Sequence, residues 1–176
     1  LLSFLTTAFL LSRPNQPKKI SVPLFESVFL PAWLAAFAPR ETPPPKPPAS
    51  GLARGEYLVK AVGHCGECHT PRTMTMATDN SRFLAGTPRG PEDQAIPNIT
   101  PDPETGIGTW SKEAFRRSMK EGVGRTGRHL YPAFPYDQFT KVKDADIDAI
   151  YAYLMAAVAP VRETTRANDF SFPVNI

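Results

Sequence analysis

The stretch "GHCGECHTPR", Gly63 to Arg72, holds both cysteines of this 176-residue chain, spaced Cys65-x-x-Cys68 and followed at once by His69. This spacing is used by structural zinc sites, by redox dithiols and by heme attachment sites. A structural zinc ion takes four sulfur or nitrogen ligands, and the chain has two cysteines and three histidines, with no second pair at finger-like spacing. A thioredoxin-type dithiol is expected between strands, whereas a helical pattern and a proline-rich loop flank this motif.

Heme attachment fits the motif best. Two thiols one helical turn apart can add to the two vinyl groups of one porphyrin, and a histidine directly after the second cysteine is placed to ligate the iron. The sequence therefore predicts one covalently bound heme c, held by Cys65 and Cys68, with His69 as the proximal iron ligand.

The 20 prolines of the chain are unevenly distributed, and many of them fall in residues 39–49. Such a stretch is typical of an extended, semi-rigid spacer. We expect four parts: an N-terminal segment (residues 1–38), this linker (39–49), a heme domain (50–159) and a C-terminal extension (160–176). The net charge of +3 is too small and too dispersed to predict nucleic-acid binding.

The N-terminal segment contains two apolar stretches, residues 1–12 and residues 20–38. The first covers about 18 Å of a hydrocarbon core roughly 30 Å thick, as expected for the end of a membrane helix. Two prolines and a glutamate interrupt the second. Both stretches could cross the membrane around a basic turn, or the second could lie in the interface or on a partner subunit. Either arrangement predicts membrane attachment.

The heme domain is predicted to be all-α. We expect helices over residues 52–62, from Ser111 as N-cap to a stop at Gly122, and from Asp144 to about Ala157. Residues 70–109 are rich in proline and glycine, which predicts a long loop around the edge of a cofactor. The carboxylates of Asp102 and Glu104 lie among turn formers, where a solvated loop is expected and calcium binding is an alternative.

Five stretches of this domain resemble the class I cytochrome c family, and more closely the cytochrome c subunits of membrane-bound periplasmic dehydrogenases for alcohols, aldehydes or nicotinate. They are "RGEYLV" (54–59), "GHCGECHTPR" (63–72), "PNITPDPETGIGTWS" (97–111), "GRHLYPAFPY" (127–136) and "DAIYAYLM" (148–155). The resemblance implies a class I cytochrome c fold. The last ten residues, "ANDFSFPVNI", resemble a connector to a further heme domain.

The resemblance leaves the sixth iron ligand open. In many family members the loop reads Tyr-Pro-Ala-Met-Pro-Tyr and its methionine binds the iron, but the matching residue here is Phe134, which cannot. We predict Met119 as the sixth ligand, because its helix covers the distal face of the heme in this family and its thioether is long and flexible. The other candidates are Met74, Met76, Met155, His64 and His129.

The resemblance implies an electron-transfer subunit without catalytic residues of its own, in the bacterial inner membrane with its heme domain on the periplasmic side. Its expected partners are dehydrogenase or integral-membrane subunits and a redox partner protein. Two alternatives remain open: a cytochrome c subunit of a terminal oxidase or other quinol-linked complex, and a ligand-binding heme enzyme or sensor with an open sixth site.

Overall fold

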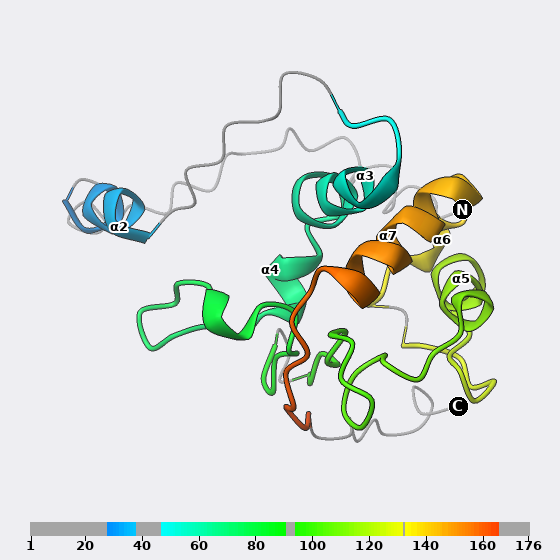
Figure 1. Ribbon diagram of the computed structural model, residues 1–176. Helices are drawn as coiled ribbons and strands as arrows, with labels where there is room; N and C mark the ends of the chain where they lie inside the picture. The colour runs from blue at the N-terminus through cyan, green and yellow to red at the C-terminus, as the bar shows by residue number, and fades with distance from the viewer. Residues whose placement is uncertain (1–27, 38–46, 91–93, 132, 166–176) are drawn as a thin grey trace, which may run out of the picture. The chain divides into compact units, whose positions relative to one another are not determined.

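The structure, a computed structural model, describes residues 28–37, 47–90, 94–131 and 133–165 (Figure 1). The described residues fall into two units, one within Leu1–Arg40 and one within Glu41–Ile176. The predicted span at residues 1–12, most of the linker and the predicted connector at the end of the chain lie outside the described residues.

In the N-terminal unit the structure describes one helix, α2 (Leu30–Phe37), which buries none of its residues. Within the described ranges no helix is both long enough and apolar enough to cross a membrane. Of the second apolar stretch, residues 20–38, the structure describes residues 28–37, and membrane attachment stays a prediction.

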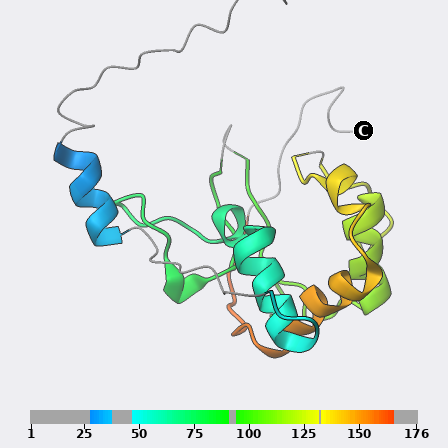
Figure 2. The same cartoon turned by 90° about the horizontal axis from the view of Figure 1, so that it is seen from above.

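The C-terminal unit begins with α3 (Gly51–Tyr57), which continues as a π-helical turn, η2 (Leu58–Val62). The helix predicted over residues 52–62 is confirmed, although the π-helical turn was not foreseen. α3 packs against α7 (Asp144–Ala156), as the view in Figure 2 shows. Gly55 lies at this crossing, where a Cβ atom would come within 2.1 Å of the Ala149 carbonyl oxygen. Glycine therefore allows the two backbones to approach this closely.

An ion pair also joins α3 to α7. The Arg54 guanidinium donates from Nε to Oδ1 of Asp146 at 2.8 Å and from Nη2 to Oδ2 at 3.0 Å. Both side chains are about one fifth exposed, so the two-pronged geometry is shielded from water on most sides.

α5 (Lys112–Glu121) begins and ends where the sequence predicts. The Ser111 hydroxyl accepts a hydrogen bond from the Ala114 N–H at 3.1 Å, and Gly122 ends the helix in the left-handed region at φ +66°. The buried residues are Phe115, Ser118 and Met119. The helix therefore presents Met119 to the core, as its spacing predicts.

α7 closes the domain and contacts both α3 and α5. Its bounds match the prediction, and its buried residues are Ile147, Ala149, Ile150, Tyr153 and Leu154. The Tyr151 hydroxyl donates to the Trp110 carbonyl at 2.9 Å. α6 (Tyr136–Phe139) was not predicted. Its four residues are too few for a helical period to be read from the sequence.

Two further short helices, α4 (Cys65–His69) and η3 (Asn80–Arg82), lie in the first half of the domain. Among the described residues there are isolated β-bridges and no strands, so the helical fold class is confirmed. The solvated-loop expectation was wrong for Asp102, which is 5% exposed. Its Oδ1 accepts from the N–H groups of Glu104 and Thr105 at 3.1 and 2.7 Å, and these donors replace water.

Candidate cofactor site

The helix α4 carries Cys65, Cys68 and His69 within a single turn. His64 precedes it in the left-handed region at φ 47°, so the chain changes direction directly before the first cysteine. Both thiols are free; Cys65 is half-buried, and Cys68 is exposed. Cys65 packs against the apolar core. The motif therefore presents one sulfur at the edge of the core and one at the surface.

The surroundings of Cys65 affect its ionisation. The pKa of the Cys65 thiol is raised to about 11, chiefly by burial and to a smaller extent by the neighbouring Cys68. A charged thiolate is disfavoured in apolar surroundings, so Cys65 keeps its proton at neutral pH.

His69 is oriented by one hydrogen bond. Its Nδ1 lies 2.8 Å from the Pro97 carbonyl oxygen. A carbonyl oxygen can only accept, so Nδ1 carries the proton and donates it, which leaves the Nε2 lone pair for a metal ion. Burial lowers the pKa of His69, while the bond to Pro97 opposes this effect. The imidazole is therefore neutral, the form that binds metals.

The loop after the motif is tied back to α4. The Gly86 N–H donates to the His69 carbonyl at 2.7 Å, and the Thr87 hydroxyl donates to the Cys68 carbonyl at 2.6 Å. The buried Thr70 hydroxyl accepts from the Leu84 N–H at 3.1 Å. The first two bonds satisfy carbonyls at the end of the short helix, and all three fix the backbone that carries His69.

These residues fit a covalently attached heme. Two free thiols one turn apart suit the two vinyl groups of one porphyrin, and the Nε2 atom of His69 suits the iron. A porphyrin also needs apolar walls, and half-buried hydrophobic side chains that pack against the core are suited to form them. They include Phe83, Ile99, Trp110, Phe134, Phe139, Val142, Tyr151 and Met155.

Among the described residues, no group of three His, Cys, Asp or Glu side chains lies close enough to hold a metal ion. The carboxylate of Asp102 faces the Thr105 hydroxyl and backbone N–H groups, and Glu104 pairs with Arg162 at 2.5 Å.

The candidates for the sixth ligand differ in burial. Met119 is 7% exposed and belongs to the apolar core, and Met155 is half-buried against it. Met74 and Met76 are fully and largely exposed, respectively, and His64 and His129 are exposed. Phe134 packs against the core and stacks on Phe139, with ring centroids 5.4 Å apart. The structure therefore leaves Met119 as the most buried candidate among the described residues.

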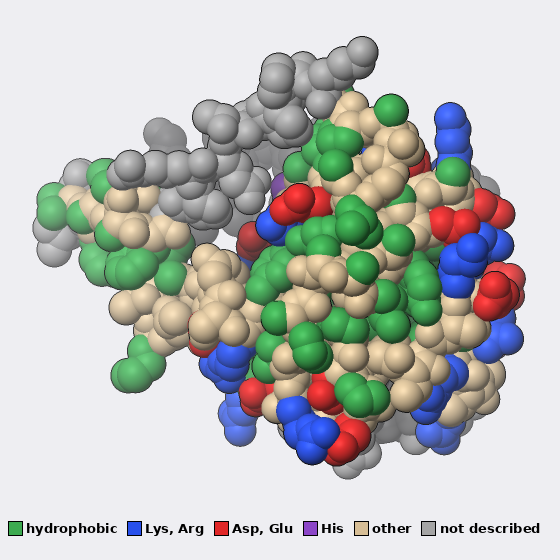
Figure 3. All heavy atoms as spheres, viewed as in Figure 1, with side chains coloured by type: hydrophobic (Ala, Val, Ile, Leu, Met, Phe, Trp, Pro, Cys, Tyr) green, Lys and Arg blue, Asp and Glu red, His purple; other side chains and the backbone are tan. Residues whose placement is uncertain are grey.

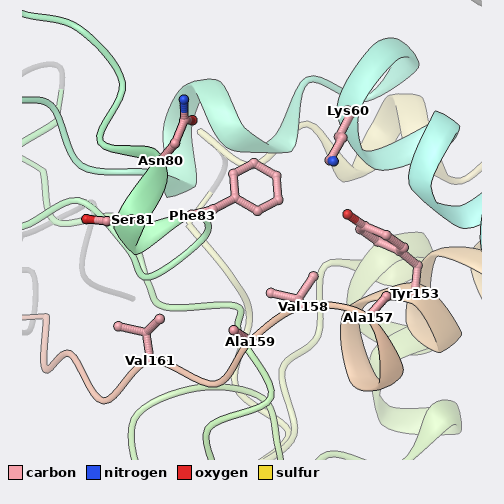
Figure 4. Close-up of a pocket in the computed structure, with 9 residues that line it drawn as sticks. All are labelled: Lys60, Asn80, Ser81, Phe83, Tyr153, Ala157, Val158, Ala159 and Val161. Atoms are coloured by element: carbon pink, nitrogen blue, oxygen red, sulfur yellow. The ribbon is translucent and has the colours of Figure 1, made fainter.

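A hollow of about 220 Å³ lies between η3 and the end of α7. Figure 4 shows Phe83 above Val158, with Lys60 at the upper right and Tyr153 at the right. On the face shown in Figure 3, hydrophobic side chains gather in the middle and charged ones toward the rim.

The residues that line the hollow are Lys60, Asn80, Ser81, Phe83, Tyr153, Ala157, Val158, Ala159 and Val161. Cys65, Cys68 and His69 are not among them, but Phe83 lies against Gly66 of the motif.

A small helical domain that presents two free thiols and an oriented imidazole on one turn defines a protein that carries a covalently attached heme. The family model for cytochrome c matches residues 52–157. This chain belongs to the cytochrome c family. Membership implies covalently bound heme c and electron transfer as the role of the domain.

Relatives of the chain are components of dehydrogenases. It is 49% identical over 146 residues to one of the subunits of the nicotinate dehydrogenase of Pseudomonas putida, and the match covers 81% of this chain and 12% of that protein. It is 38% identical over 127 residues to the gluconate 2-dehydrogenase cytochrome c subunit of Pantoea cypripedii, covering 71% and 27%. It is 36% identical over 129 residues to the cytochrome c subunit of the quinone alcohol dehydrogenase of Gluconobacter oxydans, covering 71% and 25%. The chain thus spans about an eighth to a quarter of these relatives' length.

Several residues that shape the site were not predicted from the sequence. Pro97 accepts the hydrogen bond that orients His69. Asn98 and Thr100, which follow Pro97 in the chain, are buried. All three belong to the stretch "PNITPDPETGIGTWS", which is one of the five that resemble the cytochrome c family. The hydrogen bonds of Asn98 and Thr100 to residues more than 60 positions away leave no local pattern in the sequence.

Proposed function

We propose that this domain holds one heme c through thioether bonds from Cys65 and Cys68, with His69 Nε2 as an axial ligand, and transfers one electron at a time. The observation that carries the proposal is the 2.8 Å hydrogen bond from His69 Nδ1 to Pro97, which presents the other ring nitrogen as a ligand. When bound, heme supplies a reversible one-electron couple. The chain's own residues orient the imidazole, surround the porphyrin with apolar side chains and hold water away.

Mass spectrometry of the whole chain, expressed with a heme-attachment system, tests this proposal. We expect the mass of the chain plus one heme, retained after denaturation. Cys65→Ala or Cys68→Ala should each leave one thioether and one vinyl group, which shifts the visible bands of the reduced heme in pyridine to the red. Met74→Leu, at an exposed loop residue, is the control and should behave as wild type. A mass without heme would refute the proposal, and a mass with two hemes would refute the count.

We propose Met119 as the sixth ligand. Its burial, its place in the core and the phenyl ring of Phe134 support this choice, since a soft thioether is a common second ligand of c-type heme. The ferric protein should then show a thioether-to-iron charge-transfer band that disappears in Met119→Ala and survives in Met155→Ala. A band that survives in both variants would refute the assignment.

The stacked Phe134 also supports a second candidate function, a heme with an open sixth site that binds small ligands. The two candidates differ in the reaction of the reduced protein with carbon monoxide. Pure electron transfer predicts no binding at neutral pH, whereas rapid binding by wild type would favour a ligand-binding enzyme or sensor.

For the intact protein we propose a role as an electron-transfer part of a dehydrogenase complex, supported by the names of the relatives. A tag on this chain and isolation of the complex in mild detergent, followed by mass spectrometry, should recover a dehydrogenase subunit in equal amount. Recovery of heme–copper oxidase or quinol-oxidising subunits would contradict this role.

We also propose that the domain lies on the periplasmic side of the bacterial inner membrane. The exposed apolar residues Val28, Phe29, Leu34 and Phe37 at and beside α2 support membrane attachment, because such residues favour the membrane interface. Protease added to spheroplasts should degrade the heme domain, and the chain should sediment with membranes. Protection of the domain in intact spheroplasts would contradict the periplasmic location.

A further inference from the structure

Asn98 lies at the centre of a buried hydrogen-bond network on the His69 side of the domain. Its side chain is nearly inaccessible, with the residue 3% exposed. Nδ2 donates to the Val161 carbonyl at 2.7 Å and to the Thr105 hydroxyl at 3.0 Å. Oδ1 accepts from the Thr100 N–H and hydroxyl, both at 2.8 Å. The buried amide is therefore used on both of its ends.

The partner of this network is the segment that follows α7, residues 161–163, here called the C-terminal strap. The Val161 N–H donates to the Thr100 hydroxyl at 3.2 Å, and the Glu163 N–H donates to the Thr105 hydroxyl at 3.2 Å. The strap thus contributes backbone groups, and the loop contributes three side chains: Asn98, Thr100 and Thr105. Loss of one of these side chains would leave buried polar groups of the strap with fewer partners.

Asn98 follows Pro97 directly, and the two share one peptide plane. The carbonyl oxygen at one side of this plane is the acceptor for His69 Nδ1. A peptide unit is rigid, so the position of Asn98 sets the direction of the Pro97 carbonyl. Gly86 closes the other side: a Cβ atom there would lie 2.8 Å from the Asn98 backbone nitrogen. The Pro97–Asn98 peptide is therefore held by close packing against Gly86 and by the hydrogen bonds of the Asn98 side chain.

We propose that Asn98 and Thr100 are positioning residues, through which the C-terminal strap sets the hydrogen bond from His69 to Pro97 and thereby tunes the reduction potential of the bound heme. This inference rests on the proposed ligation of heme by His69. A strong bond from Nδ1 makes the imidazole a better electron donor and stabilises the ferric state. If the Pro97–Asn98 peptide is held less firmly, the hydrogen bond from His69 weakens and the reduction potential of the heme rises.

The test uses the heme-loaded whole chain and compares Thr100→Val with Thr100→Ser. Valine has nearly the same shape and no charge, but it lacks the hydroxyl that donates to Asn98 Oδ1 and accepts from the Val161 N–H. Serine keeps this hydroxyl. We expect Thr100→Val to raise the reduction potential and to accelerate solvent exchange of the His69 Nδ1 proton in NMR by about tenfold, the effect of losing roughly one hydrogen bond. Thr100→Ser should retain the wild-type values.

Thr164→Val is the matched control, because Thr164 lies next to the strap and is exposed; it should change neither value. Asn98→Ala should raise the potential further. If that variant does not fold, the two Thr100 variants still decide the question. An unchanged potential and exchange rate in Thr100→Val, in a protein that carries its heme, would overturn this inference alone, whereas absence of heme from wild type would overturn the proposed function.

Discussion

Gly55 is the residue that sets how closely α3 and α7 approach. A Cβ atom at this position would lie 2.1 Å from the Ala149 carbonyl oxygen and 2.6 Å from the Tyr153 Cβ. Neither neighbour is the far end of a flexible side chain, so relief requires a shift of a whole helix. Since α3 leads into α4, such a shift would also move the cysteines.

Gly55→Ala should therefore destabilise the protein by about 3 kcal/mol, at the upper end for an overpacked core. Urea unfolding, followed by heme absorbance, measures the change. Gly124→Ala is the control, because a Cβ there would meet only the flexible Leu130 side chain, at 3.3 Å, and the Arg128 carbonyl, at 3.5 Å. Equal stabilities for the two variants would show that the crossing does not require glycine.

Single residues also mark the limit of prediction from sequence. The roles predicted for Cys65, Cys68 and His69 rest on three positions of one short motif, which a sequence shows directly. Asp102 and Asn98 were not recognised as buried, since polar residues among prolines and glycines usually face water. Their burial depends on donors and acceptors brought by the fold, for Asn98 from Val161, 63 residues away.

At the scale of elements, α5 is the helix whose ends are explained most directly by the sequence. Ser111 caps its first turn, and Gly122 ends it in a conformation that glycine adopts without strain. Its apolar spacing gave the buried face, including Met119. The π-helical turn and α6 left no comparable signal, because a widened turn and a four-residue helix carry no regular period.

Ser111→Ala should cost about 1 kcal/mol of unfolding free energy, because the Ala114 N–H loses its acceptor. Ser111→Asp should keep most of the stability, since aspartate also caps helices and its charge suits a helix N-terminus. Thermal unfolding of both variants checks this. A Ser111→Asp protein as unstable as Ser111→Ala would mean that the serine acts by other contacts than the cap.

At the scale of the whole molecule, three aspartates of the C-terminal unit have lowered pKa values in the folded state. The pKa of Asp146 is lowered chiefly by the hydrogen bond from Arg54, and that of Asp148 chiefly by the hydrogen bond from Arg116. The pKa of Asp102 is lowered chiefly by the backbone N–H of Thr105. These groups lie between α3 and α7, between α5 and α7, and in the loop beside the strap, so all three junctions share one dependence on pH.

The direction of this dependence follows from the lowered pKa values. Because the folded state binds protons less readily than the unfolded state, the stabilisation is complete above the ordinary aspartate pKa of 3.8 and is lost as the pH falls through the lower folded values. These three carboxylates should give a drop in the free energy of unfolding below about pH 4. The lowered pKa of His69 adds a separate loss that begins as the pH falls below its ordinary value of 6.5.

Asp146→Asn should lower stability at pH 6 and make the drop on acidification shallower, because one of the titrating groups is gone. Urea midpoints between pH 3 and pH 7 measure both effects. Glu121→Gln, at an exposed carboxylate, is the control and should leave the slope unchanged. A slope for Asp146→Asn equal to that of wild type would show that the Arg54 pair does not contribute to acid sensitivity.

The π-helical turn η2 sets how far the chain has rotated about the helix axis between α3 and the start of the cysteine motif. Its wide turn, seen in the bond from the Gly63 N–H to the Leu58 carbonyl at 2.7 Å, contains one residue more than an α-helical turn. One residue corresponds to about 100° of rotation about the helix axis. The number of residues between Gly55 and Cys65 therefore fixes the direction of Cys65. Without the extra residue, α3 could keep its face on α7 only if Cys65 turned away from the core, against which it packs.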